Sequence, residues 1–174
     1  MGRFKRTTPV PDVEGVKYDR FRDYVRADFE MCCAYCYLHE EHIGGERHFQ
    51  LDHFCPRKHC PDRIEDFYNL YWCCHGCNKP GSKHAHWPSA QLIAEGYGFV
   101  DLCTDRFEDH YELEPDGLLK PLTKKAQYTI RHIGLNCPDL VRLRRRLYRQ
   151  RQRMDAGYPD APLQQCIVAH RAPS

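Results

Sequence analysis

Two Cys-x-x-Cys pairs constrain the fold of this 174-residue chain more than any other feature of its sequence. The pairs are Cys33 with Cys36 and Cys74 with Cys77, and residues 37–73 separate them. Zn²⁺ prefers four thiolate or imidazole ligands in a tetrahedron, and two such turns supply four thiolates with little strain. We therefore predict that the four cysteines hold one structural zinc ion, which closes a long loop rather than forming the whole fold.

The other cysteines leave alternatives open. Cys32 and Cys73 adjoin the predicted ligands, and Cys55 and Cys60 lie in the loop between the pairs. A secreted disulfide scaffold is disfavoured, because the eleven cysteines are an odd number and the N-terminus lacks an apolar signal segment. Spacing favours the Cys-x-x-Cys pairs as ligands, but replacement of one ligand by Cys32 or Cys73 stays open.

Composition narrows the class of protein. No run approaches the ~20 apolar residues of a membrane span, so we expect no membrane segment and a cytoplasmic location. The formal net charge is only +2, so any affinity for nucleic acid must come from local basic patches.

The apolar pattern predicts a mixed α+β fold with one domain. We expect a flexible arm over 1–15, a single domain over 16–154 and an irregular tail over 155–174. Within the domain, the core would span 31–88, and a C-terminal hairpin and helices would span 97–154. The local signals are a helix over 16–30, strands over 48–53, 67–72 and 97–102, a hairpin around Asp116-Gly117, a helix capped by Thr123 and a last helix opened by Pro138.

The residues between the cysteine pairs suit phosphodiester hydrolysis, which needs a neutral base beside a divalent cation. His53 is a candidate base, because an imidazole is partly unprotonated near neutral pH. Asp52 and Asn78 offer hard oxygen ligands, which suit Mg²⁺ or Mn²⁺. Adjacent strand residues face opposite sides, so a second ligand has to come from another element. We expect Asn78 to provide it from a short helix after Cys77.

In this order the motif resembles the HNH endonuclease family, written C-x-x-C … D-H-x-x-P … N-L … C-x-x-C-N. The matching residues are Asp52-His53, Pro56, Asn69 and Asn78. The resemblance implies a ββα-metal core, with the zinc site and flanking N-terminal and C-terminal helices. It implies that His53 is the general base and that Asp52 and Asn78 hold the catalytic Mg²⁺ or Mn²⁺. Asn69 would pin the loop and help to orient His53, and the products would carry 5′-phosphate and 3′-hydroxyl ends.

The resemblance extends over roughly residues 18–150. Over this range the chain is similar to a bacterial HNH subgroup, some of whose members occur in phage-defence gene clusters. It therefore implies a role in anti-phage defence. One departure concerns the family's Lys a few residues after Cys-Asn, which is displaced here by Pro80. Lys79 and Lys83 are both candidates for a phosphate contact, and His84 follows them.

The last predicted helix is rich in arginine. Seven arginines lie between Pro138 and Arg153, against the single acidic residue Asp139. Arginine pairs bidentately with phosphate, so this helix is a candidate clamp for the DNA backbone, with Arg144, Arg145 and Arg149 as the contacts. A solvated helix face, or a surface for an acidic partner protein, is the alternative.

The leading hypothesis from sequence is thus a metal-dependent HNH endonuclease that acts on DNA. The alternative is a catalytically inactive, zinc-stabilised subunit that binds nucleic acid or protein within a larger complex. RNA as the substrate, and a partner protein that supplies targeting, stay open.

Overall fold

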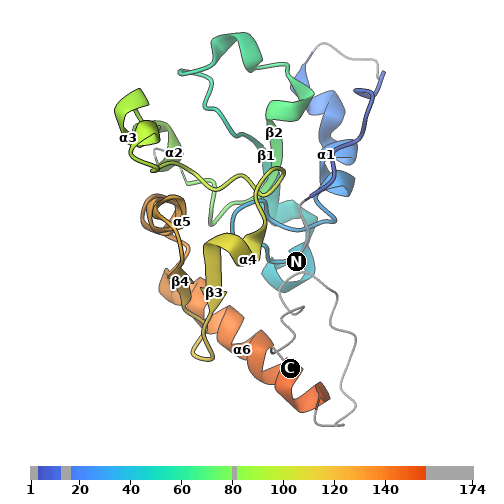
Figure 1. Cartoon of the computed structure of the whole chain (residues 1–174). Helices are drawn as coiled ribbons and strands as arrows, with labels where there is room; N and C mark the ends of the chain where they lie inside the picture. The colour runs from blue at the N-terminus through green and yellow to red at the C-terminus, as the bar shows by residue number, and fades with distance from the viewer. Residues whose placement is uncertain (1–3, 13–16, 80–81, 156–174) are drawn as a thin grey trace.

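The computed structural model describes residues 4–12, 17–79 and 82–155 of the chain (Figure 1). It mixes helices with antiparallel strands, so the α+β prediction is confirmed at this level. The strands are β1 (Phe49–His53), β2 (Leu70–Cys74), β3 (Tyr111–Leu113) and β4 (Leu119–Pro121). The α-helices are α1 (Arg22–Asp28), α2 (Ser82–Ala85), α3 (Ala90–Ala94), α4 (Phe107–His110), α5 (Lys124–Thr129) and α6 (Pro138–Asp155). Short 3₁₀ turns are η1 (Tyr18–Phe21), η2 (Glu40–Ile43), η3 (Glu46–His48), η4 (Pro61–Arg63) and η5 (Phe67–Asn69), and η6 (Ile130–Gly134) is π-helical.

The β1–β2 pair forms the centre of the first half of the molecule. The strands are antiparallel, with Asp52 opposite Tyr71 and His53 opposite Leu70. Every residue of β2 is buried, and α1 packs against this strand (Figure 1). β2 begins three residues later than the predicted strand, because the Asp66 side chain caps the turn η5 by accepting from the Tyr68 N–H at 2.9 Å. The pairing places the carboxyl end of β1 beside the amino end of β2.

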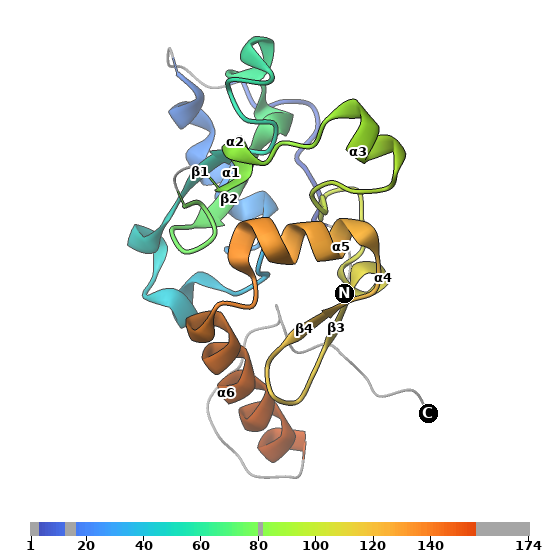
Figure 2. The same cartoon turned by 90° about the vertical axis from the view of Figure 1, so that its left-hand side faces the viewer.

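The β3–β4 hairpin lies along α6 in both views (Figure 2). This hairpin, the helix capped by Thr123 and the helix opened by Pro138 are confirmed. Gly117 has φ +91°, and a Cβ at this position would lie 2.3 Å from the carbonyl oxygen of Val141. Glycine is therefore required here both for the turn and for the close approach to α6.

The expected flexible arm is wrong for residues 4–7. Phe4 is only 3% exposed, and its N–H donates to the Leu102 carbonyl at 2.9 Å. The guanidinium group of Arg6 donates to the carbonyls of Phe67 at 2.7 Å and Leu70 at 3.0 Å. This segment is fixed because it satisfies main-chain carbonyls next to β2, which would otherwise be buried without partners.

The strand expected over 97–102 is also wrong. This segment is irregular, and the Val100 N–H donates to the Thr129 side chain at 2.8 Å instead of to a neighbouring strand. The predicted tail lies outside the described residues beyond Asp155, where α6 ends. None of the helices in the described ranges combines the length and apolar character that a membrane span requires.

Candidate metal cluster and adjoining pocket

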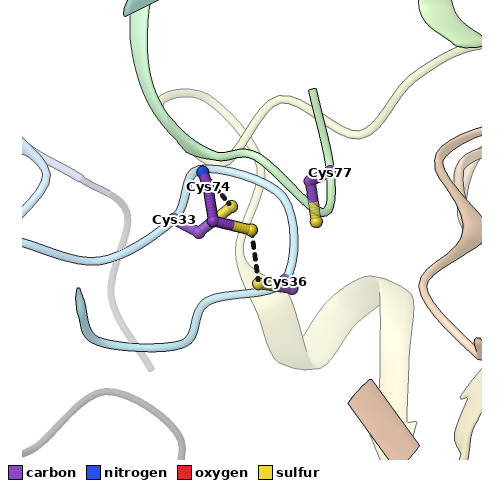
Figure 3. Close-up of side chains that lie close together, drawn as sticks. All are labelled: Cys33, Cys36, Cys74 and Cys77. Atoms are coloured by element: carbon purple, nitrogen blue, oxygen red, sulfur yellow. Dashed lines mark hydrogen bonds between the residues drawn. The ribbon is translucent and has the colours of Figure 1, made fainter. Parts of the chain in front are cut away.

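Cys33, Cys36, Cys74 and Cys77 converge from two chain segments (Figure 3). All four are buried, and their sulfur atoms lie within 4.8 Å of one another. Cys36 Sγ and Cys74 Sγ are 3.9 Å apart. Zn–S bonds of about 2.3 Å in a tetrahedron place the sulfurs about 3.8 Å apart. The four cysteines are thus positioned to bind a metal ion, and the site is compatible with structural zinc.

Local hydrogen bonds shape each cysteine turn. In the first turn, the Tyr37 N–H donates to the Cys33 carbonyl at 2.9 Å, and Tyr37 takes a positive φ of 59°. In the second turn, the N–H groups of Cys77 and Asn78 both donate to the Cys74 carbonyl at 3.0 Å. The Cys74 N–H also donates to Cys33 Sγ at 3.5 Å, which ties the two turns together. The second turn therefore fixes the position of Asn78.

The neighbouring cysteines do not belong to this four-sulfur group. The Cys73 thiol instead donates to the Cys74 carbonyl at 3.4 Å. Cys55 and Cys60 are joined by a disulfide bond that closes the loop after β1. Sequence analysis had left these two cysteines without a role.

A pocket of about 420 Å³ lies at the carboxyl end of β1. It gathers three of the four predicted catalytic residues together with several basic side chains. Its lining consists of Leu51, Asp52, His53, Pro56, Arg57, Lys58, Asn78, Lys79, Lys83 and His84. Because basic groups outnumber the single carboxylate, the pocket favours an anionic ligand.

Both ring nitrogens of His53 have hydrogen-bond partners. Nε2 lies 2.9 Å from the Ile64 carbonyl oxygen, and Nδ1 accepts from Arg57 Nε at 3.3 Å. A carbonyl oxygen can only accept, so Nε2 carries the proton and Nδ1 carries the lone pair. Burial lowers the pKa of His53, although the Ile64 carbonyl opposes this effect. The imidazole is therefore neutral near pH 7, with its lone pair on the side of Arg57.

Asn69 acts behind the pocket rather than in its wall. Its side-chain oxygen accepts from the Cys55 N–H at 2.8 Å, and its NH₂ group donates to the carbonyls of Cys55 at 3.1 Å and Arg63 at 3.0 Å. These bonds hold together the start and end of the loop that carries Ile64. Through that loop, Asn69 supports the carbonyl that orients His53.

The carboxylate of Asp52 is held on one side only. Its Oδ2 accepts from the Tyr35 hydroxyl at 2.5 Å and from the ammonium group of Lys83. Burial raises the pKa of Tyr35, so the phenol stays protonated and can donate. Oδ1 of Asp52 has no hydrogen-bond partner among residues 4–12, 17–79 and 82–155. This second oxygen is left for a ligand of the pocket.

The structure corrects two predictions around α2. Asn78 lies in a bend directly after Cys77, not on a helix, because α2 begins only at Ser82. Lys83 was a candidate phosphate contact, but it is 6% exposed and its ammonium group donates to Asp52, to the Tyr35 hydroxyl and to the His53 carbonyl. A buried ammonium with three acceptors is an anchor and does not reach a phosphate. Lys79 and His84, in contrast, are exposed at the pocket.

The prediction that Arg144 contacts DNA is wrong. Arg144 is 1% exposed, and its guanidinium group donates to the carbonyls of Gly117 and Leu135, each at 2.7 Å, and to the Asn136 side chain at 2.9 Å. It holds the β3–β4 hairpin to the start of α6. Arg145 is half-buried, and Arg149 is exposed.

Sequence reasoning missed Tyr35, Arg57 and Lys58. Arg57 and Lys58 directly follow the motif residue Pro56, and this position after a predicted strand end was a usable signal. Tyr35 lies between the first two cysteine ligands and reaches Asp52, a contact across the fold that leaves no local sequence signal.

No protein-family model fits this sequence, and no curated protein matches it. The resemblance to HNH endonucleases therefore rests on the motif residues themselves. Of these, Asp52, His53 and Asn78 line one pocket, and Asn69 lies behind it.

Proposed function

We propose that this protein is a metal-dependent endonuclease of the HNH type that hydrolyses phosphodiester bonds in DNA. One observation carries the proposal: the pocket at the end of β1 combines the Nδ1 lone pair of a neutral, buried histidine with Oδ1 of Asp52, an oxygen without a hydrogen-bond partner in the described part of the chain. Hydrolysis of a phosphodiester in this way requires a base and a divalent cation, and the carboxylate oxygen is a ligand for such a cation. The order of β1, β2 and α2 along the chain supports a ββα interpretation of the pocket.

The rim of the pocket suits a polyanionic substrate. Arg57, Lys58, Lys79 and His84 are exposed side chains of its lining. Positive groups around a pocket raise the local concentration of an anion and bind phosphate oxygens directly. A DNA backbone would enter along this rim and place one phosphodiester next to His53.

His53 would act as the general base. Its Nδ1 takes a proton from a water molecule, whose oxygen forms a bond to phosphorus while the bond from phosphorus to the 3′ oxygen breaks. The leaving 3′ oxygen receives a proton from solvent, so that the products carry 5′-phosphate and 3′-hydroxyl ends. The Ile64 carbonyl keeps Nε2 protonated throughout, and it stabilises the imidazolium that forms.

Asp52 and Asn78 would hold a divalent cation such as Mg²⁺ or Mn²⁺. Both offer oxygen atoms at the pocket wall, which is the donor type that these ions prefer. When bound, the cation would neutralise charge that develops on the phosphate and on the leaving oxygen. Tyr35 and Lys83 hold the other oxygen of Asp52, and this contact fixes the direction of the carboxylate.

The four-cysteine cluster would hold zinc and so support the pocket. Tyr35 lies inside the first cysteine turn, and Asn78 directly follows the second. A zinc ion that fixes both turns therefore fixes a hydrogen-bond donor to Asp52 and a second oxygen ligand. Zinc has a structural role in this proposal and takes no part in the chemistry.

Cleavage of supercoiled plasmid DNA tests the proposal. With Mg²⁺ or Mn²⁺, we expect the wild-type protein to convert supercoiled DNA to nicked or linear forms, and we expect His53→Ala to leave it intact. His86→Ala removes an exposed histidine outside the pocket lining and should behave like the wild type. Elemental analysis for zinc and circular dichroism would establish that each variant is folded and loaded.

A folded, zinc-loaded wild-type protein that leaves plasmid intact under these conditions would overturn the proposal. The result would favour the alternative, a zinc-stabilised subunit that binds nucleic acid or protein in a larger complex. The similarity to phage-defence nucleases extends the proposal to bacterial defence, where a partner protein would supply targeting.

A further inference from the structure

Arg57 covers the nitrogen atom that the proposed mechanism uses. It follows Pro56 in the loop that the Cys55–Cys60 disulfide closes, and it is exposed at the pocket rim. Its Nε donates to Nδ1 of His53 at 3.3 Å. Because Nε2 of His53 is bound to the Ile64 carbonyl, Nδ1 has the only lone pair on this ring. A lone pair that accepts from Arg57 is not available to a water molecule.

Tyr18 holds Arg57 in this position. The Tyr18 hydroxyl accepts from Nη2 of Arg57 at 2.5 Å, and the guanidinium carbon lies 4.8 Å from the centre of the Tyr18 ring. The same ring stands edge-on to His53, with the ring centres 4.9 Å apart. Tyr18 thus positions the arginine by one hydrogen bond and one cation–π contact. The remaining guanidinium nitrogen, Nη1, has no hydrogen-bond partner within the described part of the chain.

This arrangement is poised for exchange when an anion enters the pocket. The bond from Arg57 to His53 is long and ends on a neutral ring. A phosphodiester would offer two charged oxygens in the geometry that a guanidinium group matches, and such charge-assisted pairs are shorter and stronger. Arg57 already lines the pocket, so a change of side-chain rotamer brings its fork to a phosphate there.

We propose that Arg57 is a phosphate-responsive cover on His53. In the free protein it occupies Nδ1. When a phosphodiester binds, Arg57 pairs with the phosphate and leaves Nδ1 to the attacking water, so that the base becomes available only beside its substrate. This inference rests on the proposed function, because it assigns a partner to the proposed base.

NMR of the His53 side chain tests the cover without any cleavage. With ¹⁵N-labelled histidine and no added divalent metal, we expect Arg57→Ala to shift the Nδ1 resonance of His53 in the free protein. Addition of a short DNA duplex to the wild type should move this resonance towards the Arg57→Ala value. Arg47→Ala is the matched control, because Arg47 Nε donates to a ring nitrogen of His48 at 3.2 Å outside the pocket lining.

Steady-state kinetics of DNA cleavage provide a second test of the cover. Arg57→Ala should raise KM for DNA about tenfold, the loss expected for one charge-assisted contact, and change kcat much less. Arg57→Lys should restore part of the KM, and Arg47→Ala should leave both constants unchanged. A merely structural role would instead lower kcat and melting temperature together.

The two proposals fail in different ways. If the wild type does not cleave DNA, the proposed function is wrong. The NMR experiment then still tests whether Arg57 leaves Nδ1 of His53 when the duplex binds. If the Nδ1 resonance responds neither to Arg57→Ala nor to the duplex, the cover is wrong, whatever the nuclease activity. An unchanged KM in Arg57→Ala would also overturn it.

Discussion

The ammonium group of Lys83 donates a hydrogen bond to Oδ2 of Asp52, and both side chains are buried beside the pocket. The same ammonium reaches the Tyr35 hydroxyl at 2.7 Å and the His53 carbonyl. One lysine therefore connects the first cysteine turn, the end of β1 and α2. It also neutralises part of the charge of Asp52, so a divalent cation at this carboxylate would depend on the substrate phosphate for much of its affinity.

Lys83→Met should destabilise the protein strongly. Removal of one partner leaves the buried carboxylate of Asp52 without its cation, which typically costs about 3–5 kcal/mol. Chemical denaturation would measure the loss, with Lys58→Met as an exposed control at the same pocket. The double variant with Asp52→Asn should lose less than the sum of the two single changes. Additive losses would contradict a direct buried pair.

The cysteine cluster yields a prediction about the metal. Cys36→Ser should abolish zinc binding, because it removes one of the four converging sulfurs. Cys73→Ala should keep a full equivalent of zinc, although Cys73 is equally buried and adjoins a ligand. Elemental analysis after gel filtration checks both variants. Loss of zinc in Cys73→Ala would show that Cys73 is the true ligand.

Asn69 and Asn136 form a natural matched pair for a third prediction. Each side-chain amide both accepts from and donates to the main chain of one residue, Cys55 for Asn69 and Leu119 for Asn136. Each also has one further partner, because Asn69 donates to the Arg63 carbonyl and Asn136 accepts from Arg144. Replacement of either by Ala leaves buried main-chain groups unpaired, at about 1–3 kcal/mol for each group. Both variants should therefore lose stability by similar amounts, as measured by thermal unfolding.

Cleavage should separate the two variants. Asn69→Ala loosens the loop that orients His53 through Ile64, so plasmid cleavage should fall at least tenfold at a temperature where the protein is folded. Asn136→Ala disturbs the distant β3–β4 hairpin and its anchor Arg144, and it should keep near wild-type cleavage. Equal activities would rule out a role for Asn69 in orienting the base.

The sequence was most informative where a local pattern decides the structure. Two Cys-x-x-Cys turns specify their own geometry, so the four-sulfur cluster was predicted correctly. Asp116-Gly117 specifies a tight turn because Gly117 takes a positive φ, and Thr123 caps its helix by accepting from the Ala126 N–H at 3.1 Å. Each of these signals lies within a few residues, and distant contacts do not override it.

The sequence was least informative about basic side chains. Lys83 and Arg144 were predicted to contact phosphate, and Arg6 lies in the arm that was expected to be flexible, but each donates to main-chain carbonyls far away in the chain. Whether an arginine satisfies buried carbonyls or reaches solvent depends on tertiary packing, which single-residue patterns do not encode. The grouping of Asp52 and Asn78 in one pocket was predicted, because both offer hard oxygen ligands and both match the family motif.

Gly117 and Gly134 allow backbone strain to be separated from steric clash. Both have positive φ, +91° and +79°, but a Cβ on Gly134 meets nothing within 4 Å, while one on Gly117 meets the Val141 carbonyl at 2.3 Å. Gly134→Ala should cost about 1–2 kcal/mol for the left-handed conformation alone. Gly117→Ala should cost more than about 4 kcal/mol in urea unfolding, because the hairpin must separate from α6. Equal costs would contradict the close packing.

The exposed face of α6 supplies the last prediction. Arg142, Arg146, Arg149 and Arg153 are exposed and recur at helical spacing, so they form one basic stripe. Arg142 is paired with Asp139 at 2.6 Å, which leaves the other three as the best candidates for the DNA backbone.

The logarithm of DNA affinity falls as log salt concentration rises, and each phosphate contact adds about 0.9 to the magnitude of this negative slope. The triple variant Arg146→Ala, Arg149→Ala and Arg153→Ala should therefore reduce the magnitude of the slope by about 2.7, measured by fluorescence anisotropy with a DNA duplex. Arg144→Ala is the informative contrast, because it removes a buried hairpin anchor from the same helix. It should lower stability and leave the slope of the folded protein unchanged. A triple variant with the wild-type slope would remove α6 from the DNA surface and leave the pocket rim as the main contact.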